Sequence, residues 1–179
     1  MVSRPLRADA QRNRDRLIET ALDAFTNDGA DVTLESIAKR AGVGIGTLYR
    51  HFPTREALAE AVYRNELAKL CDAAPELLRT LPPHEATRAW MDRFVDYMAT
   101  KRGLGDALRM VIACGGDPYA ESLERLMRTM TMLLEAIDRT DVAPLDVIAT
   151  LGGIAMAPSE VGPTDGMLDL VMNGLRYRA

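Results

Sequence analysis

Residues 33–52 contain two short segments with apolar side chains at helical spacing, joined by a turn that begins at Gly42. Thr33 stands before the first segment, which runs from Leu34 to Ala41, and a threonine there is a favoured helix N-cap. Gly42 follows at a turn position that needs a positive φ, which a residue with a Cβ adopts only at a cost. Pro53 stops the second segment. The spacing therefore predicts two short helices that cross at a tight turn, with these apolar residues between them: Ile37, Ala38, Ala41, Val43 and Leu48.

Helical patterns also dominate the rest of the chain, and sustained alternation of β-branched or aromatic residues is absent. Glycine and proline separate the helical stretches. We expect an all-α fold of about nine helices, over residues 9–27, 34–41, 45–51, 55–71, 84–101, 105–114, 118–138, 144–156 and 165–177.

Charge is unevenly distributed along the 179 residues, whose net charge is −4. Residues 1–55 hold nine Lys and Arg against seven Asp and Glu, whereas residues 56–179 hold 13 against 19. A basic head on an acidic body suits local contact with phosphates. The uncharged stretch 147–159 is too short to cross a bilayer, and no apolar block follows the N-terminal charges as in a secretory signal. We therefore expect a cytoplasmic protein without a membrane partner.

A helix-turn-helix of this kind places its second helix in the major groove of DNA, with the N-terminal residues toward the base edges. The residues in that position are Ile45, Gly46, Thr47 and Tyr49. At the level of whole motifs, TLESIAKRAGV (33–43) and GTLYRHFPTREAL (46–58) resemble the TetR family of transcriptional repressors. The resemblance covers about residues 11–60.

The resemblance implies roles for individual residues. Thr47 and Tyr49 would contact bases or adjacent phosphates, His51 and Arg55 would bind phosphates, and Thr33 would anchor the first helix of the motif on the DNA backbone. Gly44 departs from the family, which often has a polar cap there, so the second helix is expected to begin less firmly. The arginines between Arg4 and Arg16 admit two interpretations, an arm that reaches the DNA or a solvated terminus.

The same resemblance predicts a DNA-binding domain over residues 1–53 and a ligand-binding and dimerisation domain over 54–179, connected by a helix over 54–71. A cluster of aromatic and methionine side chains in the second domain is a candidate lining for a small-molecule pocket, although such stripes are also typical of plain core. Its members are Trp90, Phe94, Tyr97, Met98, Met110, Met127 and Met130.

The last two helices combine small residues with an apolar stripe, which suits a symmetric four-helix dimer interface. The residues expected there are Gly152, Gly153, Leu168, Val171, Met172 and Leu175. The partners expected are thus operator DNA, a small-molecule effector and a second copy of the chain.

The expected function is thus a repressor that binds a palindromic operator as a dimer and is released by a ligand, and it has two alternatives. An architectural, ligand-independent DNA-binding protein would share the head but would not need a large acidic body. A small helical enzyme is disfavoured because the chain lacks the HExxH, GxxxxGK[ST] and GxSxG patterns. No cofactor, metal or catalytic residue is expected. Cys71 and Cys114 fit reduced, buried thiols better than a disulfide.

Overall fold

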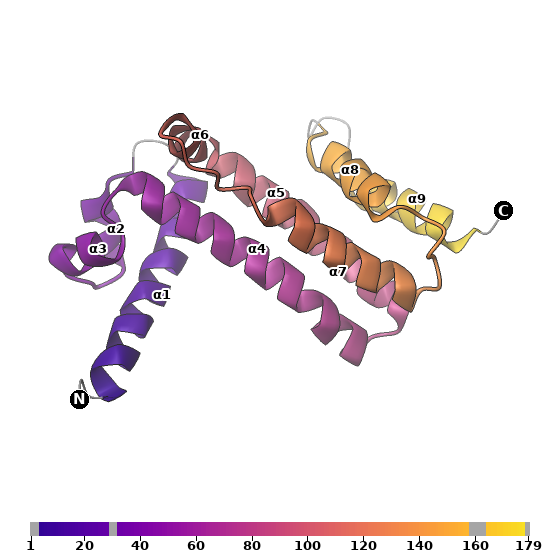
Figure 1. The fold of residues 1–179 in the computed structure, drawn as a ribbon, viewed down its shortest axis with the longest axis horizontal. Helices are drawn as coiled ribbons and strands as arrows, with labels where there is room; N and C mark the ends of the chain where they lie inside the picture. The colour runs from indigo at the N-terminus through magenta and orange to yellow at the C-terminus, as the bar shows by residue number, and fades with distance from the viewer. Residues whose placement is uncertain (1–3, 29–31, 158–163, 178–179) are drawn as a thin grey trace. The chain divides into compact units, whose positions relative to one another are not determined.

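The computed structural model describes residues 4–28, 32–157 and 164–177, with side chains from residue 8 onward. Over these ranges the chain forms helices and no strand, which confirms the all-α prediction (Figure 1). No helix in the described ranges has the length and apolarity needed to span a membrane. The helices are α1 (Arg4–Asn27), α2 (Leu34–Arg40), α3 (Ile45–His51), α4 (Arg55–Thr80), α5 (Pro83–Gly103), α6 (Gly105–Ala113), α7 (Ser122–Ala136), α8 (Pro144–Ala155) and α9 (Thr164–Arg176).

The chain divides into two compact units, which we call the head and the body. The head comprises Met1–Asn65 and Thr100–Pro118, and the body comprises Glu66–Ala99 and Tyr119–Ala179. Helix α4 therefore begins in the head and ends in the body, whereas α5 begins in the body and ends in the head.

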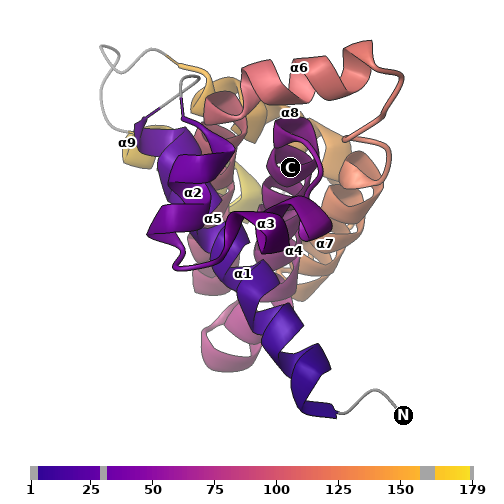
Figure 2. The same cartoon turned by 90° about the vertical axis from the view of Figure 1, so that its left-hand side faces the viewer.

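The core of the head lies where α1, α2 and α3 pack against one another (Figure 2). Leu17 from α1, Ile37 from α2 and Leu48 from α3 have no exposed surface. Burial of a leucine or isoleucine contributes about 1.5–3 kcal/mol relative to an exposed one, so these contacts fix how the short helices cross. Phe52, the C-cap of α3, is also buried.

Three predicted helix boundaries were wrong by more than a turn. Helix α7 begins at Ser122 rather than at residue 118. Helix α1 begins at Arg4 rather than Asp9, so the arginines up to Arg16 lie on a helix and not on an arm that precedes it. Helix α4 continues to Thr80 with Pro75 inside it, whereas we expected it to end near Cys71.

Helix α4 passes through Pro75 because the residues around the proline are anchored by burial. Ala74 and Leu77 are buried on either side of it, while Pro75 itself is exposed. The proline has no N–H, so the carbonyl of Cys71 lacks its helical donor. One residue earlier, the carbonyl of Leu70 accepts a hydrogen bond of 2.9 Å from the indole Nε1 of the fully buried Trp90. This bond ties α5 to the part of α4 that the proline weakens.

A buried arginine holds the C-terminal end of α9 in the body. Helix α8 packs between α7 and α9, and the residues between α7 and α8 include Arg139, which is 8% exposed. The Nη1 of Arg139 donates to the carbonyls of Gly174, Leu175 and Tyr177 at 3.1, 2.5 and 3.0 Å. Its Nε and Nη2 donate to the carboxylate of Asp141 at 2.7 and 2.9 Å. Arg139 thus caps the last turn of α9, whose carbonyls have no donor within the helix.

Candidate DNA-binding surface

The turn between α2 and α3 has the geometry of a helix-turn-helix. Thr33 is the N-cap of α2, as predicted, because its Oγ1 accepts a hydrogen bond from the backbone N–H of Ser36 at 3.2 Å. Gly42 has a φ of +63°, which confirms that this position needs a glycine. The chain is then fastened back to α2, since the N–H of Val43 donates to the carbonyl of Ala38 at 3.0 Å.

Helix α3 has one buried face and one open face. Leu48 is fully buried against the other helices of the head, whereas its neighbour Tyr49 is 44% exposed and Ile45 is 40% exposed. Gly44 and Gly46 are exposed and Thr47 is half-buried. Gly44 is the N-cap of α3 and provides no side-chain hydrogen bond, as the departure from the family pattern led us to expect. The open face is the one that a DNA groove can contact.

Tyr49 has a partner on α2 that the sequence analysis missed. Its hydroxyl donates a hydrogen bond of 3.1 Å to Oε1 of Glu35, which lies in the first turn of α2. This hydrogen bond and the negative charge of the carboxylate raise the pKa of Tyr49 above its ordinary value. The hydrogen bond thus links the exposed side chain of Tyr49 on α3 to the first turn of α2.

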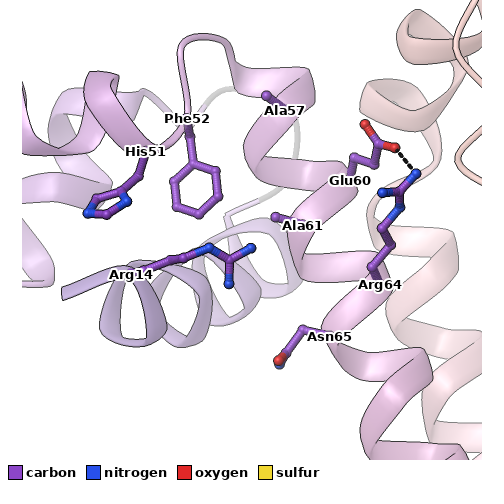
Figure 3. A pocket seen from close by; sticks show the side chains of 8 residues that line it. All are labelled: Arg14, His51, Phe52, Ala57, Glu60, Ala61, Arg64 and Asn65. Atoms are coloured by element: carbon purple, nitrogen blue, oxygen red, sulfur yellow. Dashed lines mark ion pairs between the residues drawn. The ribbon is translucent and has the colours of Figure 1, made fainter. Parts of the chain in front are cut away.

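His51 lies at the end of α3, half-buried, beside a cavity of about 370 Å³. The guanidinium of Arg14 lies 5.5 Å from the centre of the Phe52 ring, in a cation–π contact. Figure 3 shows Arg14 reaching from α1 toward Phe52 and Ala61, and the ion pair of 2.7 Å between Arg64 and Glu60. Arg14 was considered only as part of a basic terminus, and sequence spacing gives no sign that it meets Phe52. The residues that line this cavity are Arg14, His51, Phe52, Ala57, Glu60, Ala61, Arg64 and Asn65.

Arg55 makes contacts inside the head that the resemblance did not imply. Its Nη1 donates to the carbonyl of Val32, and its guanidinium carbon lies 4.7 Å from the centre of the Phe25 ring. The side chain is half-buried. Arg55 is the first residue of α4, so these contacts connect that helix to the last turns of α1 and to the residue before the Thr33 cap. The side chain has a structural role inside the head, and its role toward phosphates stays a prediction.

Arg55→Met is expected to lower the free energy of unfolding by about 1–3 kcal/mol, because the Val32 carbonyl loses a charged donor. Thermal unfolding followed by circular dichroism measures this effect. Arg50→Met is the matched control, since Arg50 is exposed on α3 and its loss should leave the melting temperature unchanged. An unchanged melting temperature for Arg55→Met, with a DNA-binding salt slope reduced by about one, would instead favour a pure phosphate contact.

Most of the predicted pocket residues lie in the core of the body. Trp90, Met130, Phe94 and Tyr97 are between 0 and 5% exposed, with the Trp90 and Phe94 rings 5.7 Å apart. Met98 and Met127 are half-buried. Met110 belongs to α6 in the head and is 52% exposed, so it does not join the cluster in the body core.

The predicted dimer residues divide into two groups. Leu168, Met172 and Leu175 are 0, 3 and 5% exposed within one chain, so they pack inside the body and have almost no surface left for a partner. Gly152 and Val171 are half-buried and Gly153 is exposed.

The two cysteines are not buried as predicted. Cys71 is half-buried in the body and Cys114 is exposed in the head. Within the described ranges, no group of three or more His, Cys, Asp or Glu side chains is placed to hold a metal ion.

Comparison with known proteins places this architecture in a defined class. Residues 17–62 match the model of bacterial regulatory proteins of the tetR family, and residues 82–177 match the model of the C-terminal domain of SbtR-like transcriptional regulators. Together with the fold, these matches define a helix-turn-helix transcriptional regulator. The chain belongs to the TetR family.

Solved structures of relatives cover nearly the whole chain. A TetR transcriptional regulator from Streptomyces coelicolor is 49% identical with a TM-score of 0.84, covering 93% of this chain and 99% of that one. A TetR regulator from Mycobacterium vanbaalenii is 35% identical with a TM-score of 0.79, covering 97% and 100%. An HTH-type transcriptional regulator of Staphylococcus aureus is 40% identical over 63 residues, which are 35% of this chain and 34% of that relative. The match thus spans about a third of that curated relative.

Proposed function

We propose that this chain is a repressor that binds a palindromic operator as a homodimer in the cytoplasm and releases it when a small molecule binds. The observation that carries the proposal is the open face of α3, where Ile45 and Tyr49 are exposed opposite the fully buried Leu48. Residues 1–53 would form the DNA-binding domain and residues 54–179 the ligand-binding and dimerisation domain.

In this proposal α3 enters the major groove with Gly46, Thr47 and Tyr49 toward the base edges. The backbone of Gly46 can approach the DNA closely because this residue carries no side chain. Thr33 and His51 would contact phosphates on either side of the groove, which fixes the register without reading sequence.

Selection of bound fragments from genomic DNA tests the DNA-binding part. The expected result is an inverted repeat whose half-sites lie one helical turn apart, about 34–36 Å. Recovery of fragments without a shared motif would contradict sequence-specific regulation. A mobility-shift screen of the recovered operator against a metabolite library then tests release. If nothing in the library weakened binding, the ligand-independent alternative would gain support.

A cavity of about 550 Å³ in the body supports the effector part of the proposal, because small-molecule sites commonly have volumes of about 300–1,000 Å³. Its lining combines charged side chains with the apolar Leu81, Ala89 and Met172. Arg88 pairs there with Asp169 at 3.0 Å and also with Asp92. We therefore place the effector beside these charged groups, between α5 and α9, rather than among the buried Trp90 and Phe94 rings. A ligand that favours the non-binding conformation would weaken DNA binding through a coupling of about 1–3 kcal/mol.

The dimer interface is proposed for the outer faces of α8 and α9. Leu145 and Met156, at either end of α8, are 49 and 69% exposed, and Ala149 is exposed between them at helical spacing. On α9, Leu170 is 72% exposed. Gly152 on α8 and Val171, which follows Leu170 on α9, are half-buried. An apolar stripe of this kind, uncovered within its own chain, suits an isologous contact with a second copy.

Leu170→Glu is expected to weaken dimerisation by at least about tenfold, because a buried, unpaired carboxylate would replace an apolar contact. Sedimentation velocity across a concentration series measures the shift. Leu123→Glu is the control, because Leu123 is 53% exposed but belongs to α7, which is not one of the two helices of the proposed face. A dimer that survives Leu170→Glu but dissociates with Leu123→Glu would move the interface to α7.

A further inference from the structure

We propose that Glu35 makes Tyr49 a reader of base amines: the Tyr49 hydroxyl accepts a hydrogen bond from the exocyclic amine of an adenine or cytosine in the major groove, instead of donating to a phosphate. The inference deepens the proposed function and rests on α3 being the recognition helix.

The first argument is the count of protons on the hydroxyl. A tyrosine hydroxyl has one proton to donate, and a carboxylate can only accept. In the structure that proton points to Oε1 of Glu35, at 3.1 Å between the oxygens. A phenol–carboxylate hydrogen bond is charge-assisted and therefore stronger than a bond to a neutral acceptor. The hydroxyl oxygen then presents only its lone pairs to an approaching DNA groove.

The second argument is electrostatic. A phosphate oxygen placed against the Tyr49 hydroxyl would also lie close to the Glu35 carboxylate, and like charges repel more strongly as a closing interface excludes water. A phosphate is therefore a poor partner for this side chain.

The third argument is the rigidity of both backbones. Glu35 lies between the Thr33 cap and the fully buried Ile37 on α2, and Tyr49 follows the fully buried Leu48 on α3. The exposed pair is therefore mounted on two helices whose other faces are fixed in the core of the head. A readout that depends on hydrogen-bond direction needs such fixed positions.

The chemistry defines which bases fit. In the major groove adenine presents an N6 amine and cytosine an N4 amine, whereas guanine and thymine present acceptor oxygens at the corresponding positions. A hydroxyl that can only accept favours the first two and is repelled by the last two. We expect one position of each half-site to prefer adenine or cytosine by about 3- to 10-fold, the effect of one hydrogen bond.

The test is selection of double-stranded DNA from a random library by the full-length protein and three variants, with melting temperatures recorded to confirm folding. Tyr49→Phe should lose the preference at one position of each half-site and keep the others. Glu35→Ala frees the hydroxyl proton, so guanine and thymine should become acceptable at that same position. Glu19→Ala removes one negative charge from an exposed site on α1 and should leave every preference unchanged.

The outcomes separate this inference from the proposed function. If Tyr49→Phe binds all sequences more weakly by the same factor, with base preferences intact, Tyr49 donates to a phosphate and the inference fails. If Glu35→Ala and Glu19→Ala change binding alike, the carboxylate acts only through its charge, which also overturns it. A wild-type protein that enriches no sequence would overturn the proposed function itself.

Discussion

Leu48→Ala is expected to lower the free energy of unfolding by about 2–5 kcal/mol and to abolish DNA binding at growth temperature. Leu48 has no exposed surface and lies on α3, which packs against α1 and α2, so truncation leaves a cavity in the small core of the head. A two-state domain has only about 5–15 kcal/mol of stability, so the head would be partly unfolded. Urea denaturation followed by circular dichroism measures the loss.

The adjacent residue provides the matched comparison. Tyr49→Ala should leave the melting temperature within about 2 °C of wild type, because the side chain is 44% exposed and its hydrogen bond to Glu35 is open to solvent. Operator binding should nevertheless be lost in a mobility-shift assay, with helicity and dimerisation intact. Wild-type DNA affinity for Tyr49→Ala would contradict the assignment of the open face of α3 to DNA.

Arg139→Met is expected to destabilise the body strongly, since three carbonyls at the end of α9 lose their donor. Methionine keeps much of the buried volume, so the effect reports the lost hydrogen bonds rather than a cavity. We expect the melting temperature to fall by about 5 °C or more. Because α9 forms part of the proposed dimer face, dissociation into monomers should accompany the change.

Arg128→Met is the control for that experiment. Arg128 lies on α7 with 71% of its side chain exposed and a long contact of 3.9 Å to Glu124. Its removal should leave both stability and assembly unchanged, because exposed ion pairs contribute little. If both substitutions lowered the melting temperature equally, the hydrogen bonds of Arg139 would contribute no more to stability than an exposed ion pair.

Periodicity and punctuation were sufficient to predict the helices. The bounds of α2 and α3 agree with the expectation to within one residue, because Thr33, Gly42 and Pro53 act locally through capping, φ and the missing N–H. Helix α4 was predicted to end near Cys71, ahead of Pro75, because a proline is locally unfavourable inside a helix. The burial of Ala74 and Leu77 outweighs this local cost. Sequence spacing carries no information on tertiary packing, so it could not predict where α4 ends.

In the candidate site, the exposure of side chains could be predicted from the sequence, but their contacts with distant residues could not. Exposure of Tyr49 and Ile45 follows from the helical spacing around Leu48. The partner of Tyr49 does not, because Glu35 lies 14 residues earlier and meets it only through the crossing of α2 and α3. The contacts of Arg55 with Phe25 and Val32 were missed for the same reason, because these residues meet Arg55 only in the folded head.

The proposed dimer interface on α8 and α9 likewise could not be predicted from sequence spacing alone. An apolar residue on α9 can face its own chain or a partner, and periodicity alone does not decide which. Leu168 and Leu170 are equally apolar, yet the first is fully buried and the second is 72% exposed. Sequence spacing predicted the helix, but only its packing against α8 shows which side of α9 is buried and which is exposed.

The uncapped start of α3 makes operator affinity adjustable without a change of sequence preference. A Cβ at Gly44 would meet nothing within 4 Å, so a serine fits there and would stabilise the first turn by about a few tenths of a kcal/mol. Such a substitution strengthens every target alike, since it orders the reading helix before it arrives at DNA. Selection can therefore tune how tightly a regulator of this kind binds its DNA targets without changing the sequences of those targets.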